Sequence, residues 1–479
     1  MGVLSGLEPK GVFRWFEELA AIPHGSHNTR AISDYLAGFA RERGLRFRQD
    51  EANNVIIWKD ASPGYEDAPT VMLQGHMDMV CEKDPDCEKD MAREGLALFL
   101  DDDEIGARGS TLGADDGIAV AMALAVLDDD AIPHGPLECL FTADEEVGML
   151  GAQALDCSDL KALALLNIDS AQEGVLTVSC AGSARLLCTL PVARAPFPGT
   201  VLRLTVSGLF GGHSGEEIHR GRGNANVLLG RALRAMSRKT ALRLIRAEGG
   251  GKDNAIPRQA EALLTVADPE AAREAVEGLD AALQNEFRVT DPGVRLRLAP
   301  AETGETPMTA ESGGRVLCLL FCLPNGVQVM SPEVPGLVQT SLNLGQVCTE
   351  GDRVLARVMV RSGVNSQRDE TAERVAALVE TLGGRAEVST AYSAWEYRAD
   401  SPLRETMIQV FRELYGREPV VTGLHAGLEC GVLLGKMPWL DCISFAPDLI
   451  DIHTPCERLR VASTQRTWAL LLETLRRLR

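Results

Sequence analysis

The sequence predicts an α/β protein in which a discontinuous domain, with a mixed or parallel sheet flanked by helices, carries an inserted α+β domain. Strand-like apolar runs alternate with amphipathic helices over residues 1–185, and the same alternation returns over residues 387–479. The stretch between them, residues 186–386, is strand-rich. Alternating strands and helices are typical of a sheet covered by helices on both faces. The length of 479 residues and a hydrophobic content of 45% suit a globular chain of two or more domains.

The outer segments supply the elements of the discontinuous domain. Residues 9–21 place Phe13, Phe16 and Leu19 on one face, the spacing of an amphipathic helix. Residues 118–127 are apolar all round, which predicts a buried helix. The remaining predicted elements are helices at residues 29–43, 403–414 and 462–478, and strands at residues 54–58, 70–73, 137–142, 162–168 and 439–445.

The inserted segment has its own order of predicted elements, which occurs twice. Two strand-rich halves follow one another, each with a helical stretch, at residues 227–236 and 370–381. The predicted strands are residues 201–206, 262–266, 294–298, 336–346 and 353–360. Because the order of elements occurs twice, the inserted domain is either a single α+β unit or an internal duplication.

The charge excludes several classes of partner. The chain has 68 Asp and Glu against 48 Lys and Arg, a net charge of −20. Binding to nucleic acid or to an anionic membrane surface needs clustered basic residues, so neither partner is expected. The longest apolar run, residues 117–127, is too short to cross a bilayer, and the N-terminal residues lack the pattern of a secretory signal. Twelve cysteines without a C-x-x-C pair predict reduced, mostly buried thiols in a cytoplasmic protein.

Acidic and histidine residues gather directly after apolar strands. His76 follows residues 71–75, and Asp78 could fix its tautomer, although a histidine after a strand is also often structural. Asp115 and Asp116 open the buried helix, where capping of the helix is the simpler interpretation. Glu145 lies in a run of three acids after residues 137–142, which repel one another unless a cation or a proton intervenes.

Together these residues indicate a metal site. Glu146 points away from its neighbour Glu145, so one could bind metal while the other acts as a base. Asp169 ends another apolar strand, and His453 is a second candidate histidine near the C-terminus. Carboxylate and imidazole ligands without thiolate fit zinc, manganese or cobalt. We therefore expect two divalent cations, most simply zinc, at strand ends of one α/β domain.

Several motifs resemble those of a known family. In chain order, the motifs at residues 75–78, 112–117 and 142–148 resemble those of the co-catalytic metallopeptidases that include the glutamate carboxypeptidases and aminoacylases. The similarity is closer to the aminoacyl-histidine (Xaa-His) dipeptidases. It rests on residues 73–83, 210–215, 221–226, 254–257 and 425–431. These motifs span nearly the whole chain.

The resemblance implies a role for each metal-site residue. Asp115 would bridge the two metals, and the peptide bond from it to Asp116 would be cis. The other implied ligands are His76 and Asp169 for one metal, and Glu146 and His453 for the other. Glu145 would be the general base and Asp78 the residue that orients His76. This branch often has Asn at the position of Asp116, a mild departure.

The resemblance also assigns the inserted domain. Residues 186–386 would form a lid on a catalytic domain made of residues 1–185 and 387–479. His213 would stabilise the oxyanion of the tetrahedral intermediate, with His219 as the alternative. Asn254 and Arg361 would lie near the substrate carboxylate, and His425 either lines the site or packs. The chain could be a monomer or a homodimer formed through the lid.

The implied reaction is hydrolysis of dipeptides. A water that bridges the two metals, deprotonated by Glu145, would attack the peptide carbonyl, and Glu145 would pass the proton to the leaving amine. The alternatives are deacylation of N-acyl amino acids at the same site and a catalytically inactive metal-binding protein. Three other histidines, His24, His27 and His134, are expected to be surface or turn residues.

Overall fold

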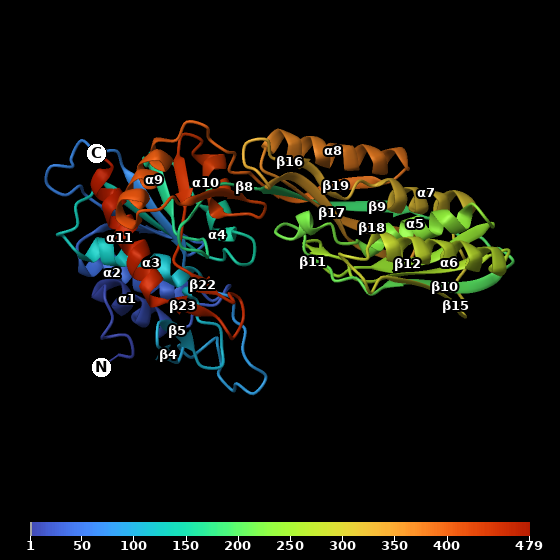
Figure 1. Cartoon of the computed structure of the whole chain (residues 1–479), viewed down its shortest axis with the longest axis horizontal. Coiled ribbons are helices and arrows are strands. Elements are labelled where there is room, and N and C mark those ends of the chain that lie inside the picture. The colour runs from blue at the N-terminus through green and yellow to red at the C-terminus, as the bar shows by residue number, and fades with distance from the viewer. Residues whose placement is uncertain (1) are drawn as a thin grey trace. The chain divides into compact units, whose positions relative to one another are not determined.

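The computed structural model describes residues 2–479, which form two compact units. The first comprises the chain up to Cys180 together with Tyr397–Gly423 and Leu428–Arg479, and the second comprises Ala181–Glu396 and Leu424–Gly427. The sequence placed the boundaries after residues 185 and 386. They lie earlier and later in the structure because two strands that pair with each other, β9 (Gly182–Pro191) and β19 (Arg385–Tyr392), both belong to the second unit. Figure 1 shows both units in one chain.

An eight-stranded mixed sheet forms the centre of the first unit. Its strand order is β1-β2-β6-β3-β7-β21-β8-β20. Strands β6, β3, β7 and β21 are parallel neighbours, so their carboxyl ends meet at one edge. The bounds are β1 Arg46–Gln49, β2 Val55–Lys59, β3 Val71–His76, β6 Leu137–Thr142, β7 Ala164–Asn167, β8 Val175–Cys180, β20 Val420–Leu424 and β21 Asp441–Ser444.

Helices enclose this sheet. The helix α3 (Ala114–Asp128) is buried along nearly its whole length and packs against α1 and β3, as its all-round apolar sequence predicts. The other helices are α1 Lys10–Ala20, α2 Arg30–Glu42, α4 Leu150–Ala154, α9 Pro402–Tyr415, α10 Glu429–Lys436 and α11 Val461–Arg477. A small sheet lies beside them, in the order β22 (Leu449–Ile450), β23 (Arg458–Arg460), β5 (Glu104–Ala107) and β4 (Leu98–Asp101).

The second unit is a nine-stranded sheet with four α-helices on one face (Figure 1). Its strands are β9, β10 Thr200–Ser207, β12 Leu242–Gly249, β14 Ala260–Val266, β15 Arg295–Pro300, β16 Gly326–Met330, β17 Val338–Glu350, β18 Arg353–Ser362 and β19. Its helices are α5 Ala225–Ser237, α6 Pro269–Glu286, α7 Ala310–Cys322 and α8 Asn365–Thr381, with a 3₁₀ turn η1 at Ile218–Arg220. A short hairpin-like pair, β11 (Gly212–His213) and β13 (Ala255–Ile256), stands apart.

The sheet of the second unit contains the same arrangement twice. In chain order, β10-α5-β12-β14-α6-β15 is one β-α-β-β-α-β half, and β9-α7-β17-β18-α8-β19 is the other. The first half has the strand order β15-β10-β14-β12 and the second β17-β18-β9-β19, so the second strands of the two halves, β12 and β17, join them. The topology favours the internal duplication over a single α+β unit.

Two of the four helices were not predicted. The helix α6 buries only Ala272, Val276 and Leu283, so its apolar pattern is weak, although Asp268 caps it and Pro269 begins it. The prediction of mostly buried cysteines is also wrong, since five of the twelve are buried. Among residues 2–479, no helix is long and apolar enough to cross a membrane.

Candidate metal centre

The predicted metal ligands of the first unit meet at the carboxyl edge of its sheet. His76 is the last residue of β3 and pairs with Thr142 at the end of β6. Glu145 and Glu146 follow β6, and Asp169 lies two residues after β7. Neighbouring parallel strands have their carboxyl ends at the same edge of the sheet, and this brings the four side chains together.

The distances separate the ligands into two groups around Asp115. The Oδ1 atom of Asp115 lies 3.2 Å from His76 Nε2, and its Oδ2 lies 3.3 Å from His453 Nε2. His453 Nε2 is also 2.8 Å from Glu146 Oε1, and His76 Nε2 is 3.9 Å from Asp169 Oδ1. One carboxylate thus presents an oxygen to each of two histidines, the arrangement that a carboxylate bridging two cations requires.

Several buried carboxyl groups are crowded together at this edge, with His76 as the nearest positive charge to Glu145 and Asp169. Burial, with Asp169, Glu429 and Glu146 nearby, raises the pKa of Glu145 well above its ordinary value. Burial likewise raises the pKa of Asp169, whose Oδ2 is buried and has no hydrogen-bond partner in the described part of the chain. Nearby positive charge stabilises the ionised forms of such a crowded set, and carboxylate and imidazole donors suit divalent cations.

Asp78 holds the ligand loops in place. Its Oδ1 accepts a hydrogen bond from the Glu145 main-chain N–H at 3.0 Å, and its Oδ2 accepts from the Ser26 hydroxyl at 2.8 Å. His76 Nδ1 lies 3.0 Å from the Asp78 carbonyl oxygen and 3.6 Å from Asp78 Oδ1. An imidazole whose Nδ1 donates there presents Nε2 toward Asp115, the orientation a metal ligand needs.

The capping interpretation of the two aspartates at the start of α3 is wrong. The Asp115 side chain faces the two histidines, while Asp116 Oδ2 accepts from the main-chain N–H of His76 at 3.2 Å. The main-chain N–H groups at the start of α3 are accepted instead by Glu457, a residue the sequence analysis did not single out. The peptide bond between Asp115 and Asp116 is cis, as predicted.

Other buried polar residues also escaped prediction. Glu429, at the start of α10, is fully buried and accepts from Gln74 Nε2 at 2.6 Å and from the Thr142 hydroxyl, and burial raises its pKa to about 7. His24 and His134, expected to be surface or turn residues, lie outside the helices and strands but are both buried and bond to nearby carbonyl oxygens, so a position at the surface is excluded. Their only sequence signal, a Pro/Gly neighbourhood, describes the turn and not its burial.

A second cluster of predicted residues lies within the inserted unit. His213 ends β11, and Asn254 directly precedes β13, the strand that pairs with β11. The Ser214 N–H donates to the Asn254 carbonyl at 2.9 Å. A Cβ atom at Gly215 would stand 3.1 Å from the His213 ring, 3.2 Å from Arg361 Nε and 2.5 Å from the His425 carbonyl. The structure therefore gathers His213, Arg361 and His425 around one glycine.

This cluster draws on both halves of the duplicated sheet. The β11–β13 pair with His213 comes from the first half, whereas Arg361 lies on β18 and Ser341 on β17, in the second. His425 Nε2 and the Ser341 hydroxyl are 2.7 Å apart. Arg361 is buried, and its Nε has no hydrogen-bond partner among residues 2–479. A buried guanidinium with a free donor suits an anionic group such as a carboxylate.

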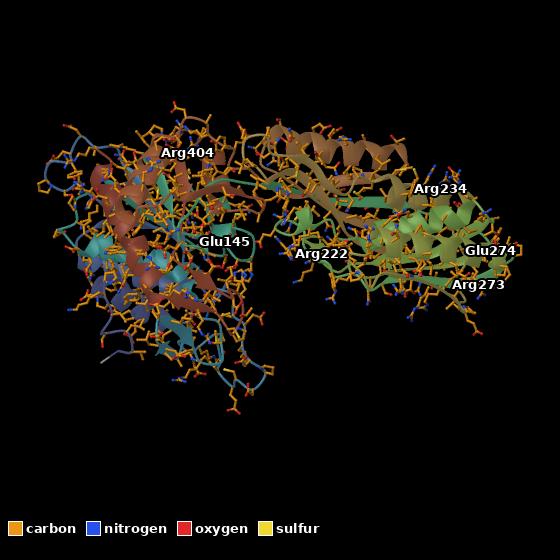
Figure 2. The ribbon with its side chains drawn as sticks, in the orientation of Figure 1. Glu145, Arg222, Arg234, Arg273, Glu274 and Arg404 are labelled. Carbon is orange, nitrogen blue, oxygen red and sulfur yellow. The ribbon has the colours of Figure 1, made fainter. Side chains whose placement is uncertain are left out.

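Comparison with known proteins places this geometry in a family. Residues 72–477 match the model of peptidase family M20/M25/M40. The chain belongs to this family. It is therefore a hydrolase of the peptidase class, with the α/β fold that the sequence predicted. Figure 2 labels Glu145, which follows β6 in the first unit.

Two relatives match over the whole chain. The cytosol non-specific dipeptidase of Escherichia coli (strain K12) is 36% identical, with 99% of each chain covered. The crystal structure of aminoacylhistidine dipeptidase from Vibrio alginolyticus is 35% identical with a TM-score of 0.92, covering 99% of this chain and 98% of that one. The aminopeptidase PepT of Bacillus cereus ATCC 10987, at 17% identity and a TM-score of 0.56 with 98% of each chain covered, shares the fold.

Proposed function

We propose that this member of the family hydrolyses dipeptides with two divalent cations, most simply zinc, with manganese or cobalt as alternatives. The observation that carries the proposal is the position of Asp115, whose two oxygens face His76 and His453. One cation would be held by His76, Asp115 and Asp169, and the other by Asp115, Glu146 and His453. The names of the two full-length relatives, both dipeptidases, support the substrate class.

The protein residues would divide the chemistry. Cations held by this set lower the pKa of water and polarise a carbonyl group. Glu145, buried with a raised pKa, would take a proton from the attacking water and deliver it to the leaving amine. Asp78 would keep Glu145 in reach, because its carboxylate holds the Glu145 main-chain N–H.

The inserted unit would act as a lid that recognises the substrate. His213 Nδ1 accepts from the Glu216 main-chain N–H at 3.2 Å, so a neutral ring carries its proton on Nε2. That N–H would be the donor to the developing oxyanion, and burial together with Arg361 lowers the pKa of His213, which favours the neutral form. Arg361, with His425 and Asn254 nearby, would bind the substrate carboxylate. His219 lies in η1, whereas the ring of His213 and Arg361 Nε are both next to the Gly215 position. We therefore take His213 as the better candidate.

The duplicated sheet bears on assembly. His213 and Arg361 come from different halves of one chain, so this cluster needs no second subunit. We infer that a monomer suffices for activity, and that the protein works in the cytoplasm, as the name of the Escherichia coli relative suggests.

A metal and substrate panel tests the proposal. Metal-stripped protein should be inactive, and two equivalents of zinc, manganese or cobalt should restore hydrolysis of dipeptides. Dipeptides with free amino and carboxyl groups should be cleaved in preference to N-acyl amino acids. Full activity of protein shown by elemental analysis to be metal-free, or preference for N-acyl amino acids, would contradict it.

A further inference from the structure

One buried carboxylate collects four consecutive main-chain N–H groups. Glu457, with 2% of its surface exposed, accepts from Leu112 and Gly113 through Oε2 at 2.7 and 3.0 Å. Its Oε1 accepts from Ala114 and Asp115 at 2.9 and 3.3 Å. Burial raises the pKa of Glu457, and these hydrogen bonds counteract that effect; together the four bonds hold the loop that carries Asp115.

The helix α3 needs such a partner from elsewhere. The first N–H groups of a helix have no intrahelical acceptor, and a side chain at the cap position normally accepts one of them. The residue at that position is Gly113, in the left-handed conformation, which offers no side chain. Because a Cβ there would lie 2.8 Å from Met79 Sδ, a larger capping residue does not fit. Glu457 does the capping from 344 residues away in sequence.

The segment that carries Glu457 also carries His453. Between them the chain makes a tight turn, in which the Glu457 N–H donates to the Thr454 carbonyl at 3.1 Å and the Thr454 hydroxyl donates to the Asp451 carbonyl at 2.7 Å. Directly after Glu457, strand β23 pairs with β5. The turn therefore links the position of His453 to that of Glu457, and the pairing of β23 holds the chain that follows.

We propose that Glu457 is a positioning residue that locks the segment of His453 to the segment of Asp115 and so sets the spacing of the group Asp115–Glu146–His453. The inference rests on the proposed function, because it concerns ligands of the proposed cations. Two of the three ligands in this group depend on the lock. The other proposed site, made of His76, Asp115 and Asp169, contains only one residue that Glu457 positions, Asp115. We therefore expect Glu457 to affect mainly the cation beside His453.

A purely structural role for Glu457 makes a different prediction, and the chain offers a matched control. Glu138, also 2% exposed, lies at the opposite end of β6 and accepts from the main-chain N–H groups of Lys161 and Ala162 at 2.9 and 3.1 Å. In both Glu138→Gln and Glu457→Gln, an amide NH₂ replaces one acceptor oxygen. Both variants should lose stability, but only Glu457→Gln should lose metal affinity.

The test measures metal affinity and stability separately. Competition with a chromophoric chelator gives the two zinc dissociation constants, and urea unfolding of the metal-free proteins gives stability. For Glu457→Gln we expect one constant to rise about 10- to 100-fold, the usual effect of losing a residue that supports a ligand, while Glu138→Gln keeps both. Equal constants for Glu457→Gln and wild type would overturn the proposal. Failure of wild type to bind two cations would instead refute the proposed function.

Hydrogen exchange on the wild type keeps the proposal testable if Glu457→Gln does not fold. In metal-free protein, the amide protons of Leu112–Asp115 should exchange at least about 10-fold more slowly than the unstructured-peptide rate, since they are bonded to a buried acceptor. Exchange of these four amides at the unprotected rate would show that the lock does not hold the loop and would overturn the proposal.

Discussion

Replacing Glu145 with Gln separates the chemistry of the centre from its stability. The side chains are nearly equal in shape, and the main-chain N–H of residue 145 still donates to Asp78, so the loop keeps its place. What is lost is the proton acceptor. We expect kcat to fall roughly 10²- to 10⁴-fold, the scale of general acid–base catalysis. That loss corresponds to about 2.7–5.5 kcal/mol in activation free energy.

The same variant should be more stable than wild type without metal. Glu145 is buried beside Asp169, Glu146 and Glu429, and its pKa is raised in the folded state. A carboxyl group with a raised pKa stabilises the fold only while protonated, and that contribution is lost as the pH rises above the unfolded value of about 4.3. Because Gln cannot ionise, the advantage of Glu145→Gln should be absent near pH 4 and grow toward pH 8.

Steady-state kinetics and elemental analysis test the expected loss of kcat in Glu145→Gln, and urea unfolding at several pH values tests its expected gain in metal-free stability. The control is Asp144→Asn, at the neighbouring residue. The Asp144 carboxylate accepts from the His27 main-chain N–H at 2.6 Å, and Asp144 is not one of the residues proposed to hold the cations. It should turn over like wild type. If Glu145→Gln retains both metals and turns over within about 10-fold of wild type, the role of general base is refuted.

Four further predictions concern the metals, the lid and the packing. Chelation should abolish activity and lower the melting temperature, and added zinc should restore both. His213→Ala should lower kcat strongly at unchanged metal content, which kinetics and elemental analysis together would check. Gly75→Ala should lower the free energy of unfolding in urea by about 1–3 kcal/mol, because its Cβ would stand 2.5 Å from a side-chain carbon of α3. Gly38→Ala, with open space around its Cβ, should raise it by about 0.5–1 kcal/mol. Burial and Arg361 lower the pKa of His425 to about 3, so its contribution to the free energy of unfolding is present above pH 6.5 and is lost as the pH falls toward 3. In urea unfolding, His425→Gln should therefore lose less stability than wild type over that pH range.

The sequence predicted the residues that follow strands, and it did so for a physical reason. His76, Glu145 and Asp169 each come directly after an apolar run, and parallel strands end at one edge. These residues could therefore be expected to lie together before any coordinates, whereas the ligand roles of Asp115, Glu146 and His453 came from the resemblance to the metallopeptidases. The alternation of strand and helix likewise fixed the fold class, but the weakly apolar α6 gave no periodic signal and was missed.

The supporting residues could not be predicted in this way. Glu457 acts on a loop 342 to 345 residues away, and Glu429 bonds to Gln74 at a separation of 355 residues. A single acid in a sequence does not reveal which distant N–H group it will accept. Burial is decided by the whole fold, which is also why His24 and His134 were misjudged.

The acids of the centre fall into two classes with different consequences for folding. Asp78 and Glu457 accept main-chain N–H groups. Burial raises the pKa of Glu457, and these hydrogen bonds counteract that effect. Glu145 and Asp169 lie among other carboxylates, and burial raises their pKa values although the charge of His76 counteracts it. The first class can frame the site in the metal-free protein, while the second opposes folding until cations bind. Binding to the folded state alone stabilises it by RT ln(1 + [L]/Kd), so we expect cations that bind among these crowded acids to stabilise the first unit.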